Sequence, residues 1–276
     1  MRMPLTLTFT ILLAAASNLL AGPYAPAAGQ SGSTAIPNNS LLIVEWASGF
    51  DDLVRGPLDI ANPGGGLATF GTGSEAVGFA DGNSTHVVSL GDGGQITLTF
   101  AHPITDGPGF DFAVFENGFA DAFLELAFVE VSSNGSDYIR FPAASLTQTS
   151  TQVGSFGALD PTNLDNLAGK YRGGFGTPFD LDQVAGLSPL VDVDHVNFVR
   201  ILDVVGSINP VLGQQDSLGN LVNEPYPTAF ASGGFDLDGV AVMNRVPEPG
   251  SIALLATGLA IVAWQRRKWR CHGGRA

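Results

Sequence analysis

The stretch LELAFVEVSSNGSDYIRF, residues Leu124–Phe141, decides the fold that the sequence predicts. It holds two runs rich in β-branched and aromatic residues, which are common in strands. Asn134 and Gly135 stand between the runs, and both residue types tolerate the positive φ angles of a type I′ turn. The stretch therefore predicts an antiparallel β-hairpin that turns at Asn134 and Gly135.

Other segments also have the pattern of strands. Gln95–Phe100, QITLTF, alternates polar and apolar residues, which places its apolar side chains on one face of a half-buried strand. Further strands are expected at Phe110–Glu116, Val196–Val205 and Phe235–Met243. Thr162–Lys170 alone has the pattern of a short helix.

Several short strands joined by Gly, Pro and Asn turns favour an all-β fold, an antiparallel β-sandwich, for residues 41–245. The order of the strand segments between Ser89 and Val242 is similar to that of jelly-roll modules of the carbohydrate-binding, galactose-binding-like type. This resemblance of pattern implies a jelly-roll-like sandwich. The length of 276 residues suits one such domain.

The charges are distributed unevenly along the chain. Between Gly22 and Pro249 there are 26 acidic and six basic residues, a formal charge of −20. Nucleic-acid binding is not expected, because contacts to phosphates need clustered Lys and Arg. The single cysteine, Cys271, excludes a disulfide framework within the chain.

The N-terminus has the layout of a secretory signal peptide. Arg2 supplies a positive charge, Leu5–Ala16 is apolar, and small residues follow near Ala21. We therefore expect a cleavable signal helix over residues 1–22. Residues 23–40 are small, polar and Pro-containing, which predicts a flexible or extended lead-in.

The C-terminus ends in an apolar run and a basic cluster. Ser251–Trp264, taken as a helix, spans roughly 21 Å, which is short for a membrane span. The positive-inside rule keeps Arg266, Arg267 and Lys268 in the cytoplasm and places the acidic body outside the inner membrane.

Residues 246–270 resemble the bacterial PEP-CTERM sorting signal. The Pro247-Glu248-Pro249 signature, a short hydrophobic transmembrane helix at 251–264 and the basic residues Arg266, Arg267 and Lys268 follow one another in the order typical of that class. The resemblance implies sorting by an exosortase, a membrane transpeptidase-like enzyme. The protein would pass through an inner-membrane-anchored intermediate to the cell surface or the extracellular space.

Three Asp-x-Asp pairs suggest a calcium site: Asp180/Asp182, Asp192/Asp194 and Asp236/Asp238. Alternation within a strand places both carboxylates of a pair on one face, where a hard cation would relieve their repulsion. The best candidate ligands are Asp236 and Asp238, with Asp111 and Glu116 from a neighbouring strand. The alternative is a solvated strand face without an ion.

Enzymatic motifs are missing from the sequence. It has no G-x-S-x-G elbow, Walker loop or H-E-x-x-H. Glu116 with Glu125 or Glu130 could form a glycosidase pair only at a suitable separation, and Glu130 is expected at the surface. We therefore expect no catalysis.

The loop Lys170–Asp182, KYRGGFGTPFDLD, is the expected ligand site. Loops on a rigid scaffold often carry binding residues, and exposed aromatic rings stack on sugars. The candidate residues are Tyr171, Arg172 and Phe175, with Asn163 and Asp165 nearby; the alternative is that the aromatic side chains fill the core.

The sequence thus predicts an exported protein of the cell surface or the polysaccharide matrix, with a structural or binding role. The first alternative is a calcium-dependent carbohydrate-binding module, and the second is a secreted glycan-active enzyme. Calcium is the one cofactor suggested. The expected partners are an exosortase, the inner membrane before processing, and an extracellular polysaccharide.

Overall fold

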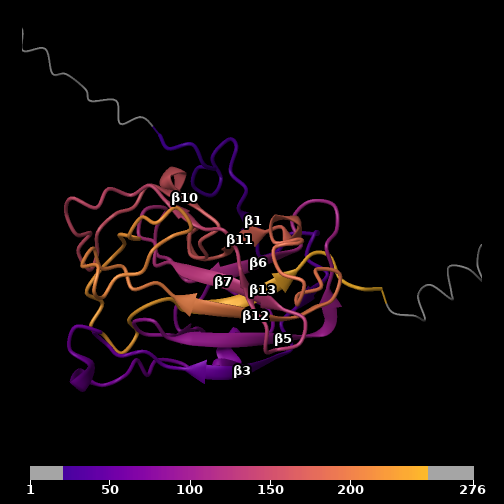
Figure 1. Cartoon of the computed structure of the whole chain (residues 1–276), viewed down its shortest axis with the longest axis horizontal. Coiled ribbons are helices and arrows are strands. Elements are labelled where there is room, and N and C mark those ends of the chain that lie inside the picture. Colours follow the sequence, from indigo (N-terminus) through magenta and orange to yellow (C-terminus); the bar gives the residue numbers. More distant parts are fainter. Residues whose placement is uncertain (1–20, 248–276) are drawn as a thin grey trace, which may run out of the picture.

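The computed structural model describes residues 21–247, and these residues form an all-β structure with antiparallel sheets. The two larger sheets lie in the centre, and loops surround them (Figure 1). Within residues 21–247, no helix is long and apolar enough to cross a membrane. The predicted signal helix at 1–22 lies almost wholly outside the described residues, and the predicted membrane helix at 251–264 lies entirely outside them.

The first sheet has six strands in the order β1-β11-β6-β13-β2, and β4 also pairs with β13. Its strands are β1 (Ile36–Pro37), β2 (Glu45–Trp46), β4 (Val88–Ser89), β6 (Phe112–Glu116), β11 (Phe175–Phe179) and β13 (Asp236–Val242). Strand β13 is buried along its whole length because it lies between β6 and the edge strands.

The second sheet has five strands in the order β3-β5-β12-β7-β8. Its strands are β3 (Gly49–Val54), β5 (Gln95–Ile104), β7 (Ala127–Ser132), β8 (Ile139–Arg140) and β12 (Val196–Asp203). A separate ladder joins β9 (Ala144–Ser145) to β10 (Leu164–Asp165). Short 3₁₀ turns occur at η1 (Pro63–Gly65), η2 (Gly73–Ala76), η3 (Pro161–Asn163) and η4 (Leu181–Gln183).

One hydrophobic core is shared by the two larger sheets. Phe112 and Val240 of the first sheet belong to the same buried cluster as Leu98, Val129 and Ile201 of the second. Alternation along β12 explains this placement, because Val199 and Ile201 are buried and Arg200 between them is not. The shared core fixes the two sheets relative to each other and provides a rigid frame for the loops.

The predicted hairpin is confirmed, but its turn differs from the prediction. Strands β7 and β8 pair in antiparallel register, with Glu130 opposite Arg140. Gly135 adopts a positive φ of 74°, whereas Asn134 does not. Instead, the Asn134 Oδ1 atom accepts hydrogen bonds from the backbone N–H groups of Ser136 and Asp137, each at 2.9 Å. Asn134 therefore stabilises a longer loop in place of a two-residue turn.

One local prediction is wrong, and the structure adds detail to a second. Residues 162–170 do not form the predicted helix. Only the 3₁₀ turn η3 reaches into this range, Asn166 has a positive φ of 48°, and β10 pairs with β9. The predicted lead-in, residues 23–40, packs on the body, since β1 pairs with β11 and the Tyr24 backbone N–H donates to the Thr162 carbonyl at 3.0 Å.

Candidate functional site

The four predicted calcium ligands do not form one site. Asp111 precedes β6, and Glu116 ends it, so the two carboxylates lie at opposite ends of the strand. Asp238 accepts a hydrogen bond from the Gly82 backbone N–H at 2.8 Å, whereas Asp236 accepts one from Asn117 Nδ2 at 3.2 Å. The alternation pattern could not reveal these different partners, because they lie far away in the sequence.

Glu116 and Asp236 belong to a set of acidic side chains inside the protein, which we call the buried carboxylates. The set consists of Glu116, Glu125, Asp203, Glu224 and Asp236, each at most 7% exposed. Burial raises the pKa of Glu116 and Glu125 well above the ordinary value, and neighbouring carboxylates raise it further. Burial likewise raises the pKa of Asp236 to about 6.

Backbone N–H groups hold most of the buried carboxylates in place. Asp203 accepts from the Phe235 N–H at 2.6 Å and from the Gly93 N–H at 2.8 Å. Glu224 Oε2 accepts from the Leu126 N–H at 2.5 Å. Glu116 Oε2 accepts from the Gly118 N–H at 2.6 Å, but its Oε1 atom is buried without a hydrogen-bond partner.

The glutamates that could have formed a glycosidase pair are all buried. Glu116 and Glu125 are buried next to each other, at 1% and 7% exposure. Glu130 is buried too, contrary to the surface position expected, because Arg140 and Arg200 both form ion pairs with its carboxylate.

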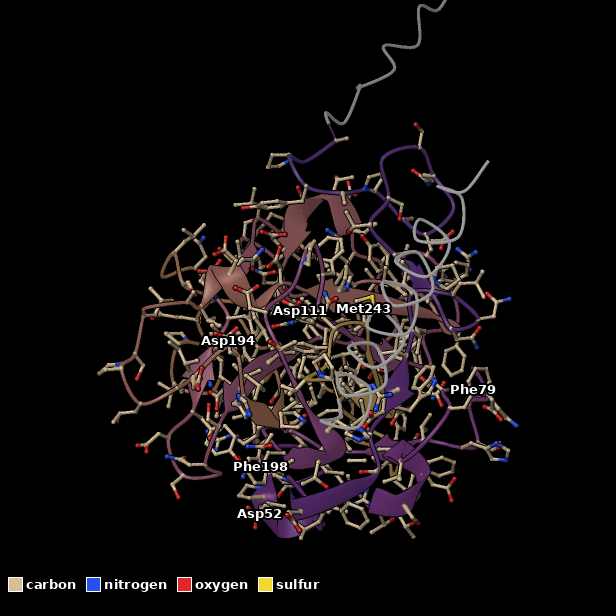
Figure 2. All side chains as sticks on the ribbon, turned by 90° about the vertical axis from the view of Figure 1, so that its right-hand side faces the viewer. Asp52, Phe79, Asp111, Asp194, Phe198 and Met243 are labelled. Carbon is tan, nitrogen blue, oxygen red and sulfur yellow. The ribbon has the colours of Figure 1, made fainter. Side chains whose placement is uncertain are left out.

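A second acidic group consists of the buried Asp111 and the partly exposed Asp106 and Asp180, and we call it the rim carboxylates. One carboxylate oxygen from each lies within 4.8 Å of the others. Burial raises the pKa of Asp111 to about 6, although hydrogen bonds from Leu181, Asn244 and Gly107 oppose the shift. Figure 2 shows Asp111 beside Met243, whose backbone N–H donates to the Asp111 carbonyl at 2.7 Å. The donor set consists of oxygen atoms, which are the ligands that calcium prefers.

The predicted ligand loop is only partly available at the surface. Tyr171 is 1% exposed, and its hydroxyl lies 2.8 Å from Thr34 Oγ1, so its ring does not offer the free face that sugar stacking needs. The Arg172 guanidinium lies over the Phe175 ring, 4.5 Å from its centroid, and pairs with Asp121. The aromatic part of the prediction is therefore wrong for Tyr171 because the lead-in covers it.

Asp165 of the predicted site does line a pocket of about 330 Å³, together with Lys170, Asn166 and Tyr24. The Lys170 ammonium donates to the Leu164 carbonyl at 2.7 Å, and burial lowers the pKa of Lys170 to about 8. Asn163, by contrast, lies in η3 and does not line this pocket. The sequence could not predict the pocket, since residues 23–25 of the lead-in form one of its sides.

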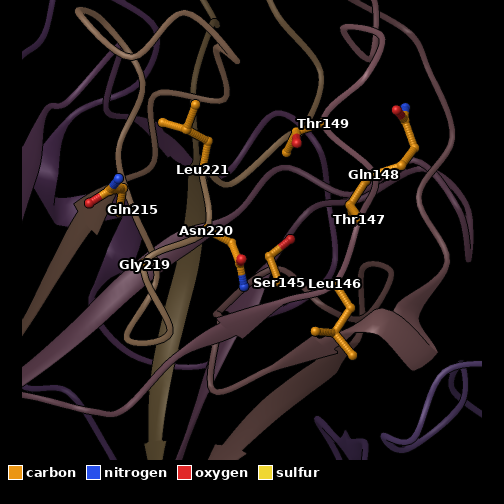
Figure 3. A pocket seen from close by; sticks show the side chains of 9 residues that line it. All are labelled: Ser145, Leu146, Thr147, Gln148, Thr149, Gln215, Gly219, Asn220 and Leu221. Carbon is orange, nitrogen blue, oxygen red and sulfur yellow. The ribbon is translucent and has the colours of Figure 1, made fainter.

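A larger pocket, of about 460 Å³, lies between residues 145–149 and residues 215–221 (Figure 3). This pocket was not among the sites predicted from the sequence. The one local signal is the run SLTQTS at residues 145–150, which is rich in hydroxyl and amide side chains.

Comparison with known proteins identifies the C-terminal signal. A family model described as the PEP-CTERM protein-sorting motif matches residues 245–268. No curated protein matches the chain. The predicted PEP-CTERM signal is therefore confirmed, and it implies export and a membrane-anchored intermediate that an exosortase processes.

The matched range contains all the residues assigned to the sorting signal. Pro247 is the last described residue. Glu248, Pro249, Arg266, Arg267 and Lys268 lie within the match but outside the described residues.

Proposed function

We propose that this exported protein acts, after exosortase processing, as a non-catalytic binding or structural component of the cell surface or the extracellular polysaccharide matrix. The PEP-CTERM motif at residues 245–268 carries the proposal, because it directs the acidic body out of the cytoplasm. The hydrophobic core common to both larger sheets supports the jelly-roll-like sandwich on which a binding surface would be built.

The contacts at the junction between the body and the sorting motif also support processing by an exosortase beside a folded domain. Arg245 forms a bridge with Ile104, and its guanidinium donates to Glu45 Oε2 at 2.9 Å. The Val246 N–H donates to the Pro103 carbonyl at 3.0 Å. The folded body therefore extends up to the residue before Pro247, so an exosortase would act next to a folded domain.

The absence of catalysis is supported by the environment of the glutamates. Glycosidases place two carboxyl groups on either side of the bond they cleave. Glu116 and Glu125 are only 1% and 7% exposed, which leaves little of either residue accessible to a substrate, and Glu130 forms ion pairs with two arginines. These positions favour a binding role over a glycan-active enzyme.

Calcium-dependent carbohydrate binding is our second proposal, and the rim carboxylates favour it. Asp106, Asp111 and Asp180 would supply three of the six to eight oxygen ligands that calcium takes. Of the four best candidate ligands from the sequence, only Asp111 belongs to this group, while Asp180 comes from one of the three Asp-x-Asp pairs.

The test of the main proposal uses the full chain in a host with an exosortase and in the same host without it. We expect intact-mass analysis of the exported protein to find neither Met1 nor the Arg266–Lys268 cluster in the first host. Without the exosortase, or with Glu248→Ala, the C-terminal segment should remain and the protein should stay with the membrane. Glu75→Ala, an exposed acidic residue of the body, is the matched control.

The processed protein should also remain with the extracellular polysaccharide after washing in high salt. A secreted protein that keeps Met1 or the basic cluster would contradict the sorting proposal. A correctly processed protein that washes freely into the medium would contradict the proposed matrix role.

A further inference from the structure

The pocket between residues 145–149 and 215–221 has two firmly held walls. Asp216 joins them: its Oδ2 atom accepts from the Ser145 N–H at 2.8 Å, and its Oδ1 atom accepts from the Asn220 N–H at 2.8 Å. Gln215 and Leu221 form an antiparallel bridge that closes the second wall. A site held in this way loses little conformational entropy when a ligand binds.

Most of the side chains that line the pocket are polar, and none is charged. Three carry hydroxyl groups and three carry amide groups, and the nine lining residues include no acid and no base. Leu146 and Leu221 supply apolar surface. Hydroxyl and amide groups beside a small apolar surface suit a neutral, polyhydroxylated ligand, which presents both O–H and C–H groups.

Two hydroxyl groups in this pocket have no hydrogen-bond partner. Ser145 Oγ and Thr147 Oγ1 are both shielded from solvent and unpaired, and Ser145 as a whole is 1% exposed. Figure 3 shows the Ser145 hydroxyl pointing into the space between the segment with Asn220 and the segment with Thr149. A buried polar group without a partner is costly, so a ligand that supplies the missing hydrogen bond gains affinity from it.

We propose that this pocket binds a neutral glycan segment, with Ser145 and Thr147 hydrogen-bonded to its hydroxyl groups. The inference rests on the proposed role in the polysaccharide matrix and adds to it a site and a ligand class. The volume of about 460 Å³ lies within the roughly 300–1,000 Å³ of small-molecule sites. The formal charge of −20 between Gly22 and Pro249 disfavours uronic-acid polysaccharides, because like charges repel.

The experiment measures binding of the purified, processed protein to neutral glucan and galactan oligosaccharides by calorimetry, with a uronic-acid oligosaccharide as the charged probe. We expect saturable binding to a neutral probe. The dissociation constant of Ser145→Ala should be roughly tenfold higher, which is the effect expected when one hydrogen bond to the ligand is lost. The melting temperature of Ser145→Ala should be unchanged or higher, because the substitution removes an unpaired buried hydroxyl. A purely structural role of Ser145 would instead lower the melting temperature.

Thr97→Val is the matched control, because Thr97 Oγ1 is also buried without a partner but does not line this pocket. Its affinity for the neutral probe should equal that of the unchanged protein. Equal affinity of Ser145→Ala and the unchanged protein, absence of neutral-glycan binding, or tighter binding of the uronic-acid probe would each overturn the inference. A protein that is processed and retained in the matrix but binds no neutral glycan would refute this site alone, whereas failed processing or retention would refute the proposed function.

Discussion

The buried carboxylates and the rim carboxylates contain the same chemical group in different surroundings. Asp203 and Glu224 are enclosed by the protein and held by backbone N–H groups. Asp106 and Asp180 are partly exposed and face other acids across a distance that an ion could bridge. Asp111 of the rim carboxylates is itself buried and accepts from the Leu181 N–H at 2.7 Å. The partly exposed neighbours Asp106 and Asp180, and not the exposure of every member, therefore make this group available to a cation.

The largest expected effect comes from removing a buried carboxylate that organises the backbone. Asp203→Ala leaves the N–H groups of Phe235 and Gly93 without their acceptor, inside the protein. We expect the free energy of unfolding to fall by about 3 kcal/mol in urea denaturation, since unpaired buried donors are costly. Asp194→Ala, at an exposed position, should change it by less than about 0.5 kcal/mol. Similar decreases in the free energy of unfolding in both variants would show that buried and exposed acids do not differ in their contribution to stability.

The pH dependence of stability gives the next largest effect. Burial raises the pKa of Asp236 and of Asp238 to about 6, above the ordinary value near 4. A raised pKa in the folded state means that the folded protein binds protons more tightly than the unfolded chain. The stabilisation is therefore complete below about pH 4 and is lost as the pH rises through 6.

We expect the free energy of unfolding to be about 2 kcal/mol higher at pH 5 than at pH 7.5, measured in urea at both pH values. Glu116→Gln should reduce this difference, because the amide does not titrate and so removes one buried group with a raised pKa. Glu75→Gln, which is exposed, should leave the difference unchanged. A free energy of unfolding that rises steadily from pH 5 to pH 7.5 would show that Asp238 and the buried carboxylates are not the dominant titrating groups.

Much of the fold can be predicted from the sequence because it depends on local patterns. The alternation in Gln95–Phe100 and the strand composition on both sides of Asn134-Gly135 correctly predict β5, β7 and β8. The helix predicted at 162–170 fails because the pairing of β10 with β9 outweighs a weak local preference.

The candidate sites could be predicted only in part because they depend on contacts between distant residues. Asp236 and Asp238 do stand two residues apart in one strand, but a bulge between Leu237 and Gly239 and different neighbouring loops give them separate partners. Ser145 meets Asp216 across 71 residues of sequence. No periodicity in the sequence encodes such a pair.

The smallest expected effect concerns the rim carboxylates, and it decides which of the two acidic groups takes calcium. At about five times the dissociation constant, calcium should raise the free energy of unfolding by about 1 kcal/mol relative to chelator. Asp180→Asn should abolish that increase, yet change stability in chelator by less than about 0.5 kcal/mol, because asparagine can still accept the hydrogen bond from the Asp182 N–H.

The calcium effect should also be larger at pH 7.5 than at pH 5, since Asp111, with its pKa of about 6, must lose its proton to serve as a ligand. Glu116→Gln separates the two groups, because it leaves the rim carboxylates intact and should retain the full calcium effect. If Glu116→Gln abolished the effect and Asp180→Asn did not, the ion would bind among the buried carboxylates, and the unpaired Oε1 atom of Glu116 would then be one of its ligands.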